Sequence, residues 1–236
     1  MIAIDVKRKV LDENNRIATE LRDGLRESCT LTLNFIGSPG AGKTAFLERT
    51  LQMLPAGMRA AVLTGDIQTE NDAVRLARYG YPVRQIITAG ACHLDARMVQ
   101  THLRKWDIGE VDLLFIENVG NLVCPTSYDL GEDAKVVVLS VAEGEDKPLK
   151  YPGIFGKAEL MILNKTDLLP YVPFRPELAC ECARQIQPDV EIIETSSLTG
   201  AGFERWLIWL NARMQIKRAS FGRRGATVRS TAGCSR

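Results

Sequence analysis

Short apolar runs alternate with helical patterns along most of this chain. Seven runs are almost continuously hydrophobic and rich in Val, Ile and Leu, which is typical of strands buried on both faces of a parallel sheet. Between and after them, apolar residues recur at helical spacing. The pattern predicts strands over 31–37, 60–66, 83–88, 112–118, 135–142, 160–167 and 190–197, and helices over 43–54, 70–79, 95–106, 176–187 and 202–216. This order predicts an α/β fold, with a mostly parallel seven-stranded sheet flanked by helices on both faces.

The two ends of the chain differ from this central pattern. A leading helix is predicted over about 4–27, because apolar residues recur there at steps of seven and four. They are Val10, Ile17, Leu21 and Leu25. In the last helix, Trp206, Trp209 and Leu210 form a predicted buried stripe. Residues 218–236 are rich in Gly, Ser and Arg, which predicts a disordered tail after a single domain over 1–217.

Composition and charge exclude several classes of protein. The formal net charge is +1, from 30 basic and 29 acidic residues. Because there is no strong positive field, binding to nucleic acid or to a membrane surface is disfavoured. Charges interrupt the apolar residues at the N-terminus, so neither a signal peptide nor a membrane span is predicted there. We expect a cytoplasmic protein.

Residues 37–44 read GSPGAGKT and carry the strongest chemical signal. They fit the pattern G-x-x-x-x-G-K-[ST] between a predicted strand and a predicted helix, the context in which it indicates a phosphate loop. The glycines let backbone N–H groups point inward, and Lys43 would neutralise the β and γ phosphates. The predicted nucleotide-binding residues are Gly37, Ser38, Gly40, Ala41, Gly42, Lys43 and Thr44. The fold is therefore predicted to be that of a P-loop nucleoside triphosphatase.

Acidic residues at the ends of two further strands predict the catalytic machinery. Thr44 is expected to coordinate Mg²⁺ through its hydroxyl, and Asp66 to supply a carboxylate. An N-cap of the next helix is the alternative role for Asp66. Glu117 and Gly120 are expected beside the γ phosphate, where Gly120 can offer its N–H and let the loop move. The predicted catalytic set is Lys43, Asp66, Glu117 and Gly120.

A second nucleotide signal, NKTD, ends the sixth predicted strand. In GTPases such an NKxD pattern recognises guanine, because a carboxylate accepts N–H bonds that adenine does not offer in the same place. A strand-to-helix turn capped by Asp167 is the alternative, but the phosphate loop about 120 residues earlier favours the guanine site. The predicted guanine-binding residues are Asn164, Lys165 and Asp167, with Ser196 and Ser197 closing over the base. The chain is therefore predicted to hydrolyse GTP to GDP and phosphate.

Adjacent residues Cys92 and His93, together with the distant Cys124, form a candidate metal site. Thiolate and imidazole together suit Zn²⁺ or Ni²⁺. A small buried thiol without a metal is the alternative for each Cys. Position favours a metal, because Cys124 shares the segment ENVGNLVCP with Glu117 and Gly120. Three ligands leave a four-coordinate site incomplete, so water or a second subunit would complete it.

The other thiols and the second histidine have simpler interpretations. Two of the thiols are two positions apart on a predicted helix and so face different ways. The histidine lies at helical spacing from Met98 and Trp106, which indicates packing. The residues interpreted as structural or incidental are Cys29, Cys180, Cys182, Cys234 and His102.

Several motifs in one order resemble a known family. They are VKRKVL, GSPGAGKT, TGDIQTENDA, CHLDA, ENVGNLVCP, EGEDKPLKYP and NKTDLLPY. From about residue 6 to residue 214, the sequence is similar to the HypB-type GTPases that insert nickel into nickel-iron hydrogenases. That family belongs to a class of dimerising P-loop proteins that also holds the urease nickel GTPases.

The resemblance implies a cargo, partners and residue roles. It implies that Cys92, His93 and Cys124 bind nickel or zinc at a dimer interface, and that Lys150 acts near the nucleotide or across that interface. It also implies a nucleotide- and metal-dependent homodimer, a HypA-type nickel chaperone and a hydrogenase large-subunit precursor. Unlike some members, the sequence shows neither a His-rich N-terminal stretch nor a CxxCGC motif there, so nickel storage is not expected. A GTPase chaperone for another metalloenzyme such as urease, and a non-catalytic nickel or zinc carrier, stay open as alternatives.

Overall fold

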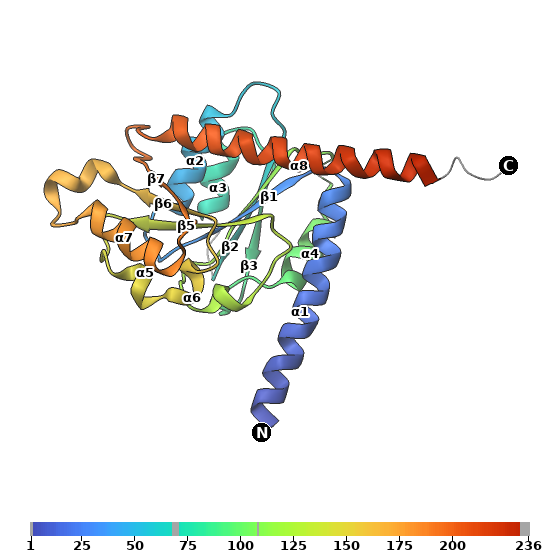
Figure 1. The fold of residues 1–236 in the computed structure, drawn as a ribbon, viewed down its shortest axis with the longest axis horizontal. Coiled ribbons are helices and arrows are strands. Elements are labelled where there is room, and N and C mark those ends of the chain that lie inside the picture. The colour runs from blue at the N-terminus through green and yellow to red at the C-terminus, as the bar shows by residue number, and fades with distance from the viewer. Residues whose placement is uncertain (1, 68–70, 108, 232–236) are drawn as a thin grey trace.

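The computed structural model describes the backbone of residues 2–67, 71–107 and 109–231, with side chains between residues 8 and 221 of these ranges (Figure 1). Seven strands form one sheet in the order β3-β2-β4-β1-β5-β6-β7, and all neighbouring strands are parallel. Their bounds are β1 Leu31–Ile36, β2 Ala60–Asp66, β3 Val83–Ile87, β4 Leu113–Glu117, β5 Ala134–Ser140, β6 Leu160–Asn164 and β7 Glu191–Glu194. The predicted seven-stranded α/β fold is confirmed.

Helices connect the strands where the periodicity predicts them. The α-helices are α1 Ile2–Glu27, α2 Lys43–Met53, α3 Asn71–Ala77, α4 Ala96–Arg104, α5 Lys147–Lys150, α6 Pro152–Phe155, α7 Pro176–Ile186 and α8 Phe203–Thr231, and the 3-10 helices are η1 Cys124–Ser127 and η2 Thr166–Tyr171. The ends of the six longer α-helices lie within two residues of prediction, except for the end of α8. The short helices were not predicted, because one or two turns are too few to show a period.

Both faces of the sheet are covered, as strands with apolar residues on both sides require. On β1, Leu33 and Phe35 pack in one cluster of buried residues, whereas Ile36 packs in another. Helices α2, α3 and α8 cover the first face (Figure 1). On the opposite face, α1 and α4 cover β2 and β4, and α6 and α7 cover β5 and β6.

An aromatic cluster between α2, α8 and the sheet anchors the first face. Trp206 is fully buried, and its ring centroid lies 5.1 Å from that of Phe46 and 6.0 Å from that of Phe35. The indole N–H of Trp206 donates to the Thr50 hydroxyl at 3.0 Å. The predicted stripe is confirmed, since Trp206, Trp209 and Leu210 are all buried. This packing fixes α2, whose N-terminus meets the GSPGAGKT loop.

The end of α8 differs from the predicted disorder of residues 218–236. The helix continues to Thr231, and residues 232–236 lie outside the described part of the chain. Its anchor is Lys217, which is buried and pairs with Asp133 at 2.7 Å. Extending an anchored helix adds a backbone hydrogen bond per residue without a new nucleus. Composition alone does not reveal this tertiary anchor.

Four of the residues interpreted as structural or incidental lie within the described part of the chain. Cys182 is buried, and Cys29 and Cys180 are half-buried free thiols. Cys234 lies outside the described residues. His102 is in the last turn of α4, where its backbone carbonyl accepts a bond from Arg84 at 2.9 Å. Over the described residues, no helix combines the length and apolar character needed to span a bilayer.

Replacing Trp206 with Ala should destabilise the fold strongly, because it removes a fully buried ring and leaves a cavity. We expect the free energy of unfolding to fall by about 3–5 kcal/mol. Ile208 is 70% exposed on the same helix and provides the matched control. Ile208→Ala should change that free energy by less than about 0.5 kcal/mol. Chemical denaturation measures both, and equal losses would contradict this account of the core.

Candidate functional site

A cavity of about 420 Å³ opens at the carboxyl ends of β1, β2 and β4. Its walls come from the loop between β1 and α2, the end of β2, helix α3 and the loop after β4. Open parallel sheets bind ligands at this edge, outside the carboxyl ends of the strands. The predicted site residues that line it are Gly40, Gly42, Lys43, Thr44, Asp66, Glu117 and Gly120.

The GSPGAGKT loop has a backbone that its glycines make possible. Gly40 and Gly42 have φ angles of 76° and 94°, which side-chain-bearing residues rarely adopt. Gly37 is required by space, since a Cβ there would lie 2.5 Å from the Val138 carbonyl oxygen. Helix α2 begins at Lys43, so its free N–H groups and positive dipole end face the loop. The loop is therefore built to hold an anion.

The Lys43 side chain is buried and folds back over the loop. Its ammonium donates to the carbonyl oxygens of Gly37 at 3.2 Å and of Ser38 at 3.4 Å. Burial lowers the pKa of Lys43, and the Glu117 carboxylate acts in the opposite direction. A phosphate in the loop would add a stronger partner for this ammonium than the two carbonyls.

Glu117, at the end of β4, is buried and incompletely paired. The Thr44 hydroxyl donates to its Oε1 at 2.7 Å, and its Oε2 has no hydrogen-bond partner among the described residues. Burial raises the pKa of Glu117 to about 7. Asp66 lines the same cavity and is not an N-cap, since it is the last residue of β2 and Ile67 after it lies in a bend. Together, the oxygens of Thr44, Asp66 and Glu117 fit a hard cation such as Mg²⁺.

Arg75 on α3 also lines the cavity and was not predicted. Its guanidinium pairs with Glu48 at 2.5 Å and with Asp72 at 3.4 Å. Among the described residues lining the cavity, Arg75 and Lys43 are the cations. Asp72 and Arg75 are three positions apart on α3, a spacing that places both side chains on one face of a helix. This spacing is the sequence signal that could have predicted the pair.

The NKTD segment lies against the GSPGAGKT loop. Asn164 is fully buried, and its amide donates to the carbonyl oxygens of Ala41 at 3.3 Å and Gly42 at 3.4 Å. Its oxygen accepts from the Ser197 hydroxyl at 3.1 Å. Gly42 leaves the room for this contact, since a Cβ there would lie 2.5 Å from the amide nitrogen. The two predicted nucleotide-binding segments are thereby joined.

The remaining predicted base residues complete this group. Ser196 is buried, and its hydroxyl donates to Oδ1 of Asp167 at 2.5 Å. Lys165 has a φ of 64°, and its ammonium donates to the Gly40 carbonyl at 2.7 Å. The structure therefore brings together residues of β6, of the loop after β7 and of the GSPGAGKT loop.

Lys150 is the predicted nucleotide-site residue that does not join this group. It ends the short helix α5, where it pairs with Asp146 at 2.8 Å and is 60% exposed. It is absent from the described residues that line the cavity. A role across a subunit interface, which the resemblance also implies, stays a prediction.

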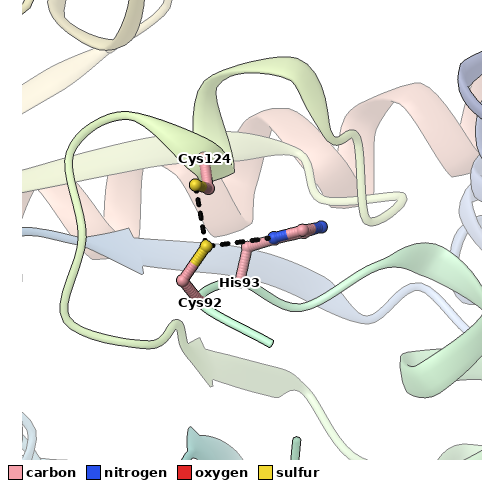
Figure 2. A group of neighbouring side chains, drawn as sticks. All are labelled: Cys92, His93 and Cys124. Atoms are coloured by element: carbon pink, nitrogen blue, oxygen red, sulfur yellow. Dashed lines mark hydrogen bonds between the residues drawn. The ribbon is translucent and has the colours of Figure 1, made fainter. Parts of the chain in front are cut away.

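Cys92 and His93, from the loop between β3 and α4, converge with Cys124 at the start of η1, as Figure 2 shows. Their ligand atoms all lie within 4.8 Å of one another. The Cys92 sulfur is 2.8 Å from the Cys124 sulfur and 3.8 Å from Nδ1 of His93. All three residues are half-buried, so an ion can reach them from solvent. Two thiols and an imidazole could hold zinc or nickel.

The surroundings of the thiol cluster suit metal ligation. The Cys124 thiol holds the pKa of Cys92 above its ordinary value, and burial lowers the pKa of His93. Ligation needs a neutral imidazole, which the lowered pKa of His93 favours, and a bound cation would stabilise the thiolates. The Tyr128 ring lies against the His93 ring, with centroids 3.9 Å apart. This contact limits the orientations of the imidazole.

The glycine-rich loop leads from β1 into α2, and the buried Lys43 side chain lies over it. This arrangement defines a P-loop nucleotide-binding protein. The family model for the CobW/HypB/UreG nucleotide-binding domain matches residues 31–194. The chain belongs to this family, and within it to the hydrogenase maturation factors HypB.

Three relatives illustrate the similarity. The hydrogenase maturation factor HypB of Escherichia coli (strain K12) is 49% identical over 210 residues, which cover 89% of this chain and 72% of that protein. The hydrogenase/urease maturation factor HypB of Helicobacter hepaticus is 40% identical, covering 83% of this chain and 81% of that protein. The crystal structure of HypB from Helicobacter pylori in complex with nickel is 36% identical, with a TM-score of 0.82 over 89% of this chain and 97% of that one. The resemblance inferred from the motifs is confirmed.

In the nucleotide-free protein, Glu117→Gln should raise stability at alkaline pH but not at acidic pH. Burial raises the pKa of Glu117 from 4.5 to about 7, so the folded protein binds this proton more tightly than the unfolded chain. The stability that Glu117 contributes is therefore fully present below pH ~4.5 and is lost as the pH rises through about 7. Gln does not ionise. Above that pH, the free energy of unfolding of the variant should therefore exceed that of wild type by up to about 3 kcal/mol.

Denaturation in EDTA at acidic and alkaline pH measures this difference. Glu204→Gln, at an exposed position of α8, controls for the loss of one carboxylate. The interpretation of Glu117 fails if its variant differs from wild type by the same amount at both pH values.

Proposed function

We propose that the protein hydrolyses GTP and uses the change of nucleotide state to control delivery of nickel into a nickel-iron hydrogenase precursor. The observation that carries this proposal is the loop after β4. It follows Glu117, the last residue of β4, passes Gly120 at the cavity and reaches Cys124 at the thiol cluster. A movement of this loop at either site would displace a residue of the other. Membership of the HypB family supports the hydrogenase as client.

The residues of the cavity supply what phosphoryl transfer requires. Lys43 and the N–H groups of its loop would stabilise negative charge on the β and γ phosphates. Thr44 and Asp66 would hold Mg²⁺, which when bound supplies positive charge to the phosphate oxygens. The unpaired oxygen of Glu117 supports a cation at this place. Glu117 and Gly120 would position the attacking water and the γ phosphate. We expect GTP turnover to be slow, as suits a switch.

Guanine selectivity is proposed to come from Asp167. Its carboxylate would accept N–H bonds from the base, and the bond from Ser196 limits its rotation. Asn164 and Lys165 hold the base segment against the phosphate loop. Ser197, bonded to Asn164, would close the other side of the base. GTP and GDP would share these contacts.

Nickel is the proposed cargo of Cys92, His93 and Cys124, with zinc as a competitor of the same ligand chemistry. Three ligands leave a coordination position for water or for a residue of a second subunit. We propose that the chain dimerises in a nucleotide- and metal-dependent manner, with the cluster at the interface. A HypA-type chaperone would supply the ion, and the hydrogenase large-subunit precursor would receive it.

A urease precursor is a second candidate client. The relative from Helicobacter hepaticus bears the name hydrogenase/urease maturation factor, so one HypB is named for two clients. The nucleotide and metal sites would be the same, and only the receiving protein would differ. Co-purification of the tagged protein from its own cells, with each precursor quantified, distinguishes the two clients.

Asp167→Asn should change the base preference from guanine towards xanthine. The new amide can accept only one of the two guanine N–H bonds and presents an N–H donor in place of the second acceptor, whereas xanthine presents an oxygen to that donor. GTP binding should weaken about 10- to 100-fold, since a lost buried pairing costs about 1–3 kcal/mol. Hydrolysis and binding of GTP and XTP measure the change, with the exposed Asp189→Asn as control.

Unchanged GTP affinity in Asp167→Asn would remove the guanine assignment. A wild-type protein that binds GTP without hydrolysing it would instead be a non-catalytic metal carrier.

Nickel affinity should differ between the GDP-bound protein and the protein bound to a non-hydrolysable GTP analogue. Typical coupling between two sites predicts a difference of about 5- to 150-fold, and nickel should alter nucleotide affinity by the same factor. Cys124→Ala should lower nickel affinity and abolish the difference, while guanine binding persists. Cys180→Ala, at a half-buried thiol outside the cluster, is the control.

Calorimetric titration of nickel in each nucleotide state, with the dimer fraction followed by sedimentation, measures this coupling. Equal affinities together with equal dimer fractions would leave a GTPase without the proposed switch.

A further inference from the structure

The loop after β4 touches the phosphate loop through two neighbouring residues. An isolated antiparallel bridge pairs the backbone of Asn121 with that of Gly37, the first residue of GSPGAGKT. One position earlier, Gly120 lies so close to Pro39 that a Cβ would come within 3.0 Å of the Pro39 Cα. The two backbones are therefore closely packed at these positions, so that a shift of the phosphate loop would be transmitted to Gly120 and Asn121.

The same loop holds the segment that carries two of the candidate metal ligands. The Asn121 amide donates to the Cys92 carbonyl oxygen at 3.2 Å. The Leu94 N–H donates to the side-chain oxygen of Asn118 at 3.1 Å. These bonds lie on either side of His93 in the sequence. The loop after β4 thus fixes the backbone of the metal-binding segment at two points.

Asn121 also orders the approach to the third ligand. Its side-chain oxygen accepts from the Val123 N–H at 2.8 Å, directly before Cys124. A single amide side chain therefore bonds to the Cys92 segment with its nitrogen and to the Cys124 segment with its oxygen. Its backbone meets the phosphate loop at the same time. Over the described residues, these bonds make Asn121 a direct link from the nucleotide loop to both thiol segments.

We infer that Asn121 is the positioning residue that transmits the nucleotide state to the metal cluster, an inference that rests on the proposed coupling of the two sites. Asn118 does not fit this role, because it is buried and held by Asn34 at 3.3 Å within the sheet. Asn121 is half-buried and lies beyond Gly120, where the loop can respond to a γ phosphate. Its displacement would change the separation of the two thiols without breaking the fold.

Two substitutions separate the bonds that Asn121 makes. Asn121→Asp keeps an oxygen for the Val123 N–H but loses the donor to the Cys92 carbonyl. Asn121→Ala loses both. Nickel is titrated into each variant with GDP and with the non-hydrolysable GTP analogue, and the nickel–thiolate absorption is recorded in each state. The new carboxylate can alter nickel affinity by its charge, and Asn121→Ala, which adds no charge, controls for that effect.

In wild type, the ratio of nickel affinities between the two nucleotide states should be about 5- to 150-fold. In both Asn121 variants it should fall to within about twofold of one, and the difference between the two absorption spectra should disappear. GTP affinity and thermal stability should stay close to wild type in Asn121→Asp, since no proposed nucleotide contact is removed. Asn15→Asp, an exposed change on α1, controls for the added charge and should keep the wild-type ratio.

Different outcomes overturn the inference about Asn121 and the proposed coupling of nucleotide and metal binding. If wild type shows the ratio and either Asn121 variant retains it, the inference about Asn121 is overturned while the proposed function stands. If wild type shows no ratio, the proposed coupling is overturned, and the inference falls with it.

Discussion

The position of β4 between β2 and β1 is the constraint on which both candidate sites depend. Parallel pairing places Phe35 beside Glu117, so the end of β4 lies next to the start of the phosphate loop. Both strands are buried on both faces, and slipping their register by one residue would turn every side chain to the wrong face. Hydrophobic burial thus fixes the strands and, through them, the distance between the cavity and the thiol cluster.

Buried polar residues add a second constraint beneath the loops. Asn118 donates to Asn34 at 3.3 Å, and Asn34 donates to Glu132 at 3.2 Å, while Glu132 pairs with Lys135. Breaking one member would leave its partners unpaired in a medium of low dielectric, so such a chain resists distortion. Asn118, the first residue of the loop after β4, is therefore held firmly, and we expect a response to a ligand in the residues that follow it.

Sequence patterns predict those features that have a period or a motif. Seven strands and six longer helices follow from periodicity, and the phosphate loop follows from glycines at fixed spacing. Long-range contacts have no such signal. Arg75 enters the cavity and Asn121 bridges two loops only because the strand order brings distant segments together. The end of α8 depends likewise on a pair formed by Lys217 and Asp133. For Lys150, the motif implies a contact that the structure of the single chain does not contain. The motif implies a position near the nucleotide, whereas Lys150 pairs with Asp146.

The hydrogen bonds of the Asn164 amide affect how such a protein can evolve. Because this amide joins the NKTD segment to the phosphate loop, hydrogen bonds within the protein hold the two predicted nucleotide-binding segments together, which reduces the conformational entropy that binding would cost. The residues predicted to contact the base lie at the ends of β6 and β7 and beyond them, whereas the residues proposed to respond to a third phosphate follow β4. In the proposed function, selectivity for the base and responsiveness to the third phosphate therefore depend on separate segments, and mutation can alter either one while the other is preserved.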